Sequence, residues 1–205
     1  MKMVKLSCFQ LLFVLFFTCC HEQKKLPVLG EITVDSITGK EEHYKAPNFR
    51  LTNQLAEISS HEDFRDKIQV VDFFFTSCPT ICPTMSGHLR QVQEAFADND
   101  KVNLLSFTID PKRDRPQQLK EYAERYGADH NTWKFLTGNR DTIFELSRDY
   151  KVMAREDSEH GENFLVHDGT FVLVDGERRI RGYYNGLDRM DTQKLIGDIK
   201  ILLQE

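Results

Sequence analysis

Residues 70–85 read Val70-Val-Asp-Phe-Phe-Phe75-Thr-Ser-Cys78-Pro-Thr-Ile-Cys82-Pro-Thr-Met85. The apolar run 70–75 is typical of a strand whose sheet is covered on both faces. Apolar residues then recur at positions 85, 89, 92 and 96, which predicts an amphipathic helix. The two cysteines therefore lie where a strand is followed by a helix. If they share one helical turn their thiols can point the same way, and they could close a disulfide or hold one soft metal ion.

The rest of the chain alternates strands and helices. A stretch with strand character begins at residue 46, and 61–64 reads as a short helical turn. The expected later elements are strands over 102–109 and 133–136, helices around 119–126 and 143–150, a hairpin formed by 170–174 and 180–183, and a last helix over 195–202. This order predicts an α/β fold with a central mixed sheet and helices on both faces. A cysteine pair at a helix start, a crossover and then a hairpin with a helix is the thioredoxin-like arrangement.

The first 20 residues differ from the rest and predict export. Lys2 and Lys5 precede the apolar run 11–17, which is shorter than the roughly 20 residues that span a bilayer. Residues 1–20 are therefore interpreted as a signal peptide, a lipoprotein signal or an N-terminal anchor. Cys19 or Cys20, directly after the run, would be the lipidated residue. Each interpretation places the domain outside the cytoplasm. A lipidated cysteine or an uncleaved anchor would tether it to the membrane of a bacterial envelope, facing the periplasm.

The remaining sequence predicts one domain. Residues 21–45 are interpreted as a tether with a small β element, and 46–205 as the thioredoxin-like domain, which a chain of 205 residues can accommodate with a full core. The composition, with 40% hydrophobic and 29% charged residues, is ordinary for a globular protein. The net charge of −5 argues against a nucleic-acid partner, because such domains usually carry a basic face.

The positions of the cysteines limit the chemical roles that they can have in the folded domain. Cys8 lies in the leader and Cys19 and Cys20 lie at its edge, so only Cys78 and Cys82 belong to the folded part. A disulfide scaffold would need several bridges. The pair is therefore expected to be redox-active or metal-binding, and the N-terminus of the following helix would stabilise a thiolate.

His167 adds a third candidate ligand. Thioredoxin-type oxidoreductases separate their cysteines by two residues and place a cis-proline before the hairpin. Here three residues intervene, no proline follows Pro116, and Val166-His167-Asp168-Gly169 occupies the position that faces the cysteines. Two thiolates suit Cu(I), and an imidazole extends the range to Cu(II). Zinc accepts the same ligands, but a zinc hydrolase is not expected because no Glu neighbours the thiols.

Two acidic residues follow the second strand, in Asp110-Pro-Lys-Arg-Asp114-Arg-Pro116. We expect Asp114 to cap the next helix, with Pro116 in its first turn. The carboxyl ends of neighbouring parallel strands meet at one edge of a sheet, so Asp110 lies on the edge that carries the cysteines. Asp110 is therefore a candidate to orient the metal loop through a hydrogen bond from outside the ligand set.

Taken together, these residues resemble the Sco/SenC family of thioredoxin-fold copper chaperones. The matching segments are the cysteine motif from Phe73 to Met85, the Asp110-Pro-x-x-Asp-x-Pro116 turn, His167 before Phe171-Val-Leu-Val-Asp175, and Arg179-Ile-Arg-Gly-Tyr-Tyr-Asn-Gly186. The likeness spans roughly residues 46–203, and the cysteine motif is its most specific part.

The resemblance implies that Cys78, Cys82 and His167 bind one copper ion. It also implies that the protein delivers copper to the dinuclear copper centre of a cytochrome c oxidase subunit, or first reduces the cysteines of that subunit. A copper donor protein and a thiol reductant would be further partners. Asp110 matches the acidic residue that the family has after the strand. Many members carry an acid immediately before the histidine, whereas this chain has Val166 there and Asp168 after it.

A second hypothesis is an exported thiol–disulfide oxidoreductase that uses Cys78 and Cys82 as its redox pair without a metal. It explains the cysteines but leaves His167 without a role. A peroxide-reducing enzyme on the same fold is disfavoured, because Ser77 and Thr80 do not form the activated site that such enzymes need. The sequence therefore favours a metal-binding and transfer protein over an enzyme.

Overall fold

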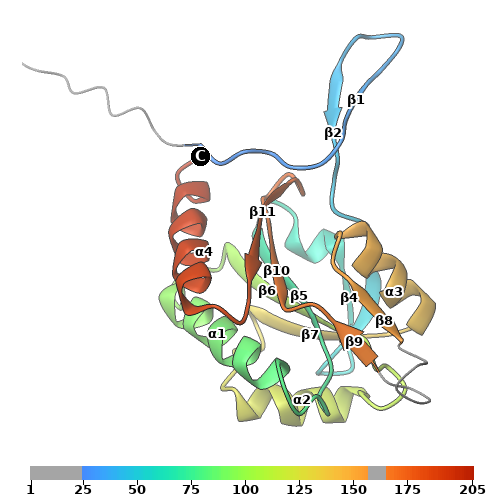
Figure 1. Cartoon of the computed structure of the whole chain (residues 1–205), viewed down its shortest axis with the longest axis vertical. Coiled ribbons are helices and arrows are strands. Elements are labelled where there is room, and N and C mark those ends of the chain that lie inside the picture. The colour runs from blue at the N-terminus through green and yellow to red at the C-terminus, as the bar shows by residue number, and fades with distance from the viewer. Residues whose placement is uncertain (1–24, 157–164) are drawn as a thin grey trace, which may run out of the picture.

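The computed structural model describes residues 25–156 and 165–205. Its central sheet has the strand order β11-β10-β5-β6-β7-β3-β4 (Figure 1). The strands are β3 (Arg50–Asn53), β4 (Ile58–Ser60), β5 (Ile68–Phe74), β6 (Val102–Thr108), β7 (Trp133–Thr137), β10 (Thr170–Val174) and β11 (Ile180–Asn185). β5, β6 and β7 run parallel and the other neighbours pair antiparallel. The predicted mixed sheet is confirmed.

Helices cover both faces of this sheet. They are α1 (Cys82–Ala95), α2 (Pro116–Arg125), α3 (Arg140–Asp149) and α4 (Arg189–Leu202), with a 3₁₀ turn η1 at His61–Phe64. The apolar sides of α1, α2 and α4 share one core with Val70 and Phe74. α3 and η1 share a second core with Val71 and Phe73 on the opposite face. Because successive strand residues point to opposite faces, the fully buried β5 can serve both cores.

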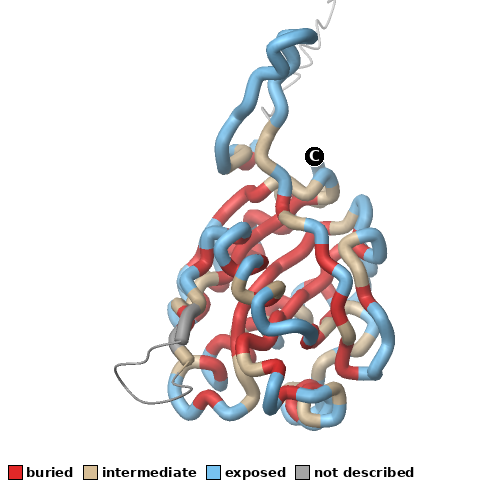
Figure 2. The backbone as a smooth tube through the Cα atoms, turned by 90° about the vertical axis from the view of Figure 1, so that its right-hand side faces the viewer, coloured by how far each residue is buried: buried red, intermediate tan, exposed pale blue. Residues whose placement is uncertain are grey.

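The sheet register places the two ends of β5 in different surroundings. β10 runs antiparallel to β5, with Val172 opposite Val71 and Val174 opposite Gln69. The end of β5 therefore meets the start of β10, just after His167. The start of β5 meets the turn between β10 and β11. Figure 2 shows the buried strands in red through the centre of the body.

The segment before the domain contains an ordered hairpin. Its strands β1 (Ile32–Val34) and β2 (Glu41–His43) pair antiparallel and project from the body, so the predicted β element is confirmed (Figure 1). The residues before the hairpin lie against the domain, because Leu26 is buried and Leu29 N–H donates to the carbonyl of Ile180 over 2.8 Å. The part of the segment 21–45 that the structure describes is thus partly packed on the domain.

Four short strands were not predicted: β2, β4, β8 (Ala154–Glu156) and β9 (Leu165–His167). β8 and β9 form a separate two-stranded sheet that ends at His167. The predicted leader (1–20) lies outside the described residues, as do residues 157–164. Over 25–156 and 165–205, none of the helices is both long enough and apolar enough to cross a membrane.

Candidate metal centre

The two cysteines occupy different kinds of backbone. Cys82 is the first residue of α1, with Pro83 in the first turn as expected, and Cys78 lies in the loop between β5 and α1. The expectation that both share one helical turn is therefore wrong. Pro79 gives the physical reason, because a proline disfavours helical backbone at the residue before it. The helix fixes Cys82, whereas the loop alone positions Cys78.

Three candidate ligand atoms meet at the end of β5. The Sγ atoms of Cys78 and Cys82 and a ring nitrogen of His167 all lie within 4.8 Å of one another, and all three residues are buried. Cys82 Sγ is 3.2 Å from His167 Nε2. The two thiols are free. The sheet register thus brings together residues that lie 85 positions apart in the sequence.

The contacts of the imidazole leave the correct nitrogen available to a metal. His167 Nδ1 lies 2.8 Å from the backbone carbonyl oxygen of Asp168. A carbonyl oxygen can only accept, so Nδ1 carries the hydrogen and the lone pair of a neutral ring is on Nε2. The ring of Phe75 packs edge-on against the imidazole, with 5.9 Å between ring centroids. The imidazole of His167 is therefore held in one orientation, with Nε2 facing the thiols.

The pKa values of the two thiols are shifted in opposite directions. The hydrogen bond from the Cys82 side chain lowers the pKa of Cys78, against the effect of burial, and His167 and the backbone N–H groups of Cys82 and Thr80 lower it further. The bond to Cys78 and burial raise the pKa of Cys82. Cys78 is therefore the thiol that ionises first. A metal ion that binds both sulfurs has to displace the proton of Cys82.

Asp114 does not cap α2; the N-cap is Arg115. The Asp114 carboxylate is fully buried and accepts hydrogen bonds from Thr76 N–H (2.9 Å) and from the hydroxyls of Thr76 and Thr108. Burial raises its pKa, and these bonds oppose the rise. The cap prediction is wrong because the loop before the first cysteine, Thr76 included, offers the carboxylate donors that outcompete the helix end. The available signal was the pair of threonines at the ends of two neighbouring parallel strands.

Asp110 is linked to the cysteine loop less directly than Asp114 is. Its carboxylate lies 3.8 Å from Nε of Arg113, and Arg113 Nη1 donates to Ser77 Oγ over 2.8 Å. Within the described residues, no hydrogen bond joins Asp110 to either cysteine or to His167. The Asp110 carboxylate is linked to the cysteine loop through Arg113 and Ser77, and its backbone carbonyl is linked to that loop through Asp114, whose N–H donates to it over 2.8 Å. Its role in orienting that loop stays a prediction.

Sequence reasoning missed a buried acid within β5. Asp72 is 1% exposed and accepts a hydrogen bond from Ser106 Oγ, which accepts from Trp133 Nε1 over 2.9 Å. Burial raises the pKa of Asp72 to about 7, while the bond from Ser106 opposes the rise. An acid inside an otherwise apolar strand was the visible signal. This carboxyl group adds a titratable site to the same strand that leads into the cysteine loop.

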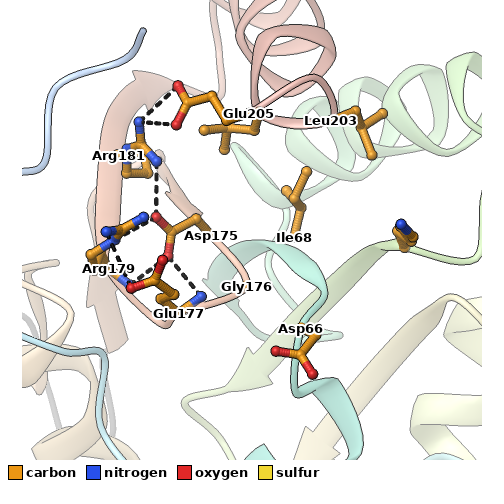
Figure 3. A pocket seen from close by; sticks show the side chains of 11 residues that line it. Asp66, Ile68, Asp175, Gly176, Glu177, Arg179, Arg181, Leu203 and Glu205 are labelled. Atoms are coloured by element: carbon orange, nitrogen blue, oxygen red, sulfur yellow. Dashed lines mark hydrogen bonds and ion pairs between the residues drawn. The ribbon is translucent and has the colours of Figure 1, made fainter.

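A hollow of about 310 Å³ lies at the opposite end of β5 (Figure 3). Its lining includes Arg181 and the two carboxylates that bond to it, Asp175 and Glu205, and it contains neither cysteine nor histidine. We call Leu26, Asp175, Arg181 and Glu205 the terminal clasp, because they tie the N-terminal segment to the last residue. The soft ligand atoms therefore gather at one end of β5, and the buried Arg181 with its carboxylate partners lies at the other.

Comparison with known proteins identifies relatives along most of the chain. A family model described as SCO1/SenC matches residues 38–204. The SCO1 protein homolog of Bacillus subtilis is 30% identical over 203 residues, which cover 98% of this chain and 97% of the homolog.

Two solved structures share the fold. One is BsSco, described as a Sco-family cytochrome c oxidase assembly protein with a disulfide switch. It has a TM-score of 0.67 and 32% identity, covering 78% of this chain and 93% of that chain. The other is copper-bound ScoI of Bradyrhizobium japonicum, with a TM-score of 0.65 and 25% identity, covering 77% of this chain and 99% of that chain. The thioredoxin-like α/β fold predicted from the sequence is thereby confirmed.

Proposed function

Because the chain belongs to the SCO1/SenC family, we propose that it is a copper-binding chaperone that delivers copper to the dinuclear copper centre of a cytochrome c oxidase subunit. One observation carries the proposal: the Sγ atoms of Cys78 and Cys82 and a ring nitrogen of His167 lie within 4.8 Å of one another. Copper is the cargo of this site, and the three side chains are its proposed ligands.

The spacing and chemistry of these atoms fit a single soft ion. Two sulfurs at about 2.3 Å from a common ion lie at most about 4.6 Å apart, so a spread of 4.8 Å requires only a small adjustment on binding. Thiolate ligands select Cu(I), and the neutral imidazole nitrogen suits both copper oxidation states. The described relatives include a copper-bound ScoI and a protein of oxidase assembly, which supports copper as the cargo and the oxidase as the destination.

The chemistry of uptake follows from the protonation states. In the reduced protein, copper replaces the proton of the Cys82 thiol, and the lone pair of His167 Nε2 completes the ligand set without a proton change. In a reductive role on the client, Cys78 and Cys82 would give two electrons and the proton of Cys82 to a client disulfide, and solvent would supply the second proton because Cys78 is already ionised. A Cys78–Cys82 disulfide would form, and the client would keep two thiols. An oxidised pair has no thiolate to offer, so copper would leave.

The tether is proposed from the sequence alone. Residues 1–20 would hold the protein at the outer face of the cytoplasmic membrane, either through a lipid on Cys19 or Cys20 or as an uncleaved anchor. A copper donor protein and a thiol reductant would serve the same site before delivery. The intact mass of the membrane-extracted protein distinguishes a lipidated residue from an intact leader.

A copper titration of the purified, reduced protein tests the ligand set. Cu(I) is added in competition with a chelator of known affinity, and the wild type is compared with Cys78→Ser, Cys82→Ser and His167→Ala. We expect one copper per chain in the wild type and at least a hundredfold weaker binding in each variant. His43→Ala, which removes an imidazole from β2, is the matched control and should bind as the wild type does. Unchanged affinity in both cysteine variants would refute the site.

A transfer assay tests the destination. The copper-loaded protein is mixed with a metal-free, reduced copper-centre domain of a cytochrome c oxidase subunit. We expect copper to appear on the client domain, measured by metal analysis after the two proteins are separated, at a rate that falls in His167→Ala. Copper that stays on the chaperone at excess client would separate copper binding, which the first experiment measures, from delivery.

A further inference from the structure

The two thiols depend on different parts of the molecule for their positions. Cys82 belongs to α1 and is held by the helix and by the hydrophobic core in which it is buried. Cys78 has no helix to hold it, and its backbone N–H donates to the carbonyl of Phe75 over 3.2 Å. The residues just before Cys78 must therefore be fixed if its sulfur is to stay near Cys82 and His167.

These residues are fixed from the neighbouring loop between β6 and α2. Asp114 accepts from both the backbone N–H and the hydroxyl of Thr76, two residues before Cys78. It also accepts from the Thr108 hydroxyl at the end of β6, which lies in register with Phe74 at the end of β5. The carboxylate thus joins the ends of two parallel strands, and one of these strands leads directly into the cysteine loop.

A second contact adds to this arrangement. Arg113 Nη1 donates to Ser77 Oγ over 2.8 Å, so each of the two residues before Cys78 has a partner in the same loop. The two contacts differ in strength. Arg113 is exposed, so water can replace its bond, whereas Asp114 is fully buried and water cannot replace its bonds. The buried contact is therefore the one that determines the conformation.

We propose that Asp114 is a positioning residue for Cys78: its buried carboxylate holds Thr76 and thereby sets the distance of the Cys78 sulfur from Cys82 and His167. The inference rests on the proposed function for its effect on copper, but its effect on the thiol is independent of any metal. It assigns to Asp114 the orienting role that the sequence suggested for Asp110.

Loss of the carboxylate should act on Cys78 and spare Cys82. In Asp114→Ala the Thr76 N–H and two hydroxyls lose their buried acceptor, so the loop opens more often. The alkylation rate of Cys78 should rise about five- to tenfold, the ratio expected when one or two buried hydrogen bonds no longer oppose local opening. The rate at Cys82 should change less than about twofold, because the helix still holds it. Copper affinity should fall about 10- to 100-fold, as for other residues that orient metal ligands.

The experiment uses full-length, reduced protein in metal-free and Cu(I)-loaded form. Iodoacetamide labelling followed by mass spectrometry gives separate rates for Cys78 and Cys82, and a chelator competition gives copper affinity. Asp114→Asn keeps an acceptor for Thr76 N–H and should retain most of the affinity. Asp198→Ala is the matched control, since it also removes a buried carboxylate that accepts from a hydroxyl, that of Tyr184. It should leave the ratio of the two thiol rates unchanged.

Thr76→Val keeps the proposal testable if Asp114→Ala does not fold. It removes only the hydroxyl and should raise the Cys78 rate by a smaller factor than Asp114→Ala. Combining Thr76→Val with Asp114→Asn should give less than the product of the single effects, because both act on one contact. Equal rate increases at Cys78 and Cys82 would overturn the proposal, because they indicate general destabilisation. If the wild type binds no copper, the proposed function fails while the labelling ratio still decides the role of Asp114.

Discussion

At the start of β5, the Arg181 guanidinium is almost fully buried and each of its nitrogens has an acceptor, whereas at the end of β5 the buried sulfurs of Cys78 and Cys82 have few partners. Arg181 donates to Pro27 O, to Asp175, to Leu26 O and to both oxygens of Glu205 over 2.6–3.0 Å. At the other end, the Cys82–His167 contact of 3.2 Å joins atoms that are themselves candidate metal ligands. The same strand therefore connects a polar cluster that is complete with one that is incomplete.

The comparison between the two ends of β5 distinguishes two roles of buried polar groups: one is to stabilise the fold and the other is to bind a ligand. A buried charge that is fully hydrogen-bonded can be retained in a fold, although removing one partner is costly. Buried soft atoms that converge on one another, with a long 3.6 Å contact from Cys78 Sγ to Thr80 Oγ1 beside them, are available to a ligand. We therefore expect changes at the terminal clasp to alter stability and spare metal binding, and changes at the cysteines to do the reverse.

Oxidation of the cysteine pair should have the largest of the predicted effects. That effect should be confined to the end of β5 that carries the cysteines. A protein with a Cys78–Cys82 disulfide has lost both thiolates and should retain no copper after gel filtration, and reduction should restore one copper per chain. The amide of Leu26, which donates to Glu205 in the clasp, should exchange with solvent deuterium at an unchanged rate. Copper retained by the oxidised protein would show that the thiolates are not the main ligands.

Arg181→Met should have the largest effect at the other end. It leaves Asp175 and Glu205 without their buried partner, which should lower the free energy of unfolding by about 3–5 kcal/mol. Copper affinity should stay within about twofold of the wild type, since the two ends share no contact. Chemical denaturation and copper competition on the same preparation measure both quantities. A large loss of copper affinity in the folded variant would remove the distinction between the ends.

The pH dependence of stability should also differ between the ends. Burial raises the pKa of Asp72 from 3.8 to about 7, so between these values the folded state binds more protons than the unfolded state. Its contribution to the free energy of unfolding is therefore greatest at low pH and is lost as pH rises toward 7, by up to about 4 kcal/mol at 1.36 kcal/mol per unit.

Glu205 behaves in the opposite way. Burial raises its pKa, but the bonds from Leu26 N–H and Arg181 outweigh this effect and lower it overall from 4.5. Its contribution is present above pH 4.5 and is lost as pH falls below that value. Denaturation of the metal-free protein between pH 3 and pH 8 should show that Asp72→Asn removes the loss above pH 4 and Glu205→Gln the loss below it. Equal slopes in wild type and Asp72→Asn above pH 4 would contradict the assignment.

Leu26→Ala should produce the smallest of these effects. Leu26 is 8% exposed and its carbonyl accepts from Arg181, so truncation should lower the free energy of unfolding by about 2 kcal/mol, near the low end for buried leucines. Ile37→Ala is the control, because Ile37 is 93% exposed at the tip of the β1–β2 hairpin and should change stability by less than about 0.5 kcal/mol. Equal effects would mean that the segment before the hairpin does not contribute to the fold.

Local patterns were sufficient to predict most of the fold. The apolar run before Cys78 and the helical period after Pro83 predicted β5 and α1, and the paired segments 170–174 and 180–183 predicted the β10–β11 hairpin. The short strands β4, β8 and β9 were not predicted, because their three-residue sequences show little alternation of apolar and polar residues. Their strand conformation depends on partners elsewhere in the chain.

The site was predictable where it depends on strand order and not where it depends on register. The position of His167 opposite the cysteines followed from the arrangement of the elements. The role of Asp114 did not, because it requires Thr108 to align with Phe74 across two strands. The loop position of Cys78 was missed because the spacing of four residues was read as one helical turn, although Pro79 argued against it.

The antiparallel pairing of β10 with β5 also determines how the molecule resists a pulling force. Leu26 is fastened beside Glu205 and Arg181, at the end of the sheet opposite the metal residues. A pull between a held N-terminal segment and a partner bound at the cysteines would run lengthwise along β5 and β10. Antiparallel strands loaded in this direction resist in shear, with their hydrogen bonds sharing the force instead of breaking one after another.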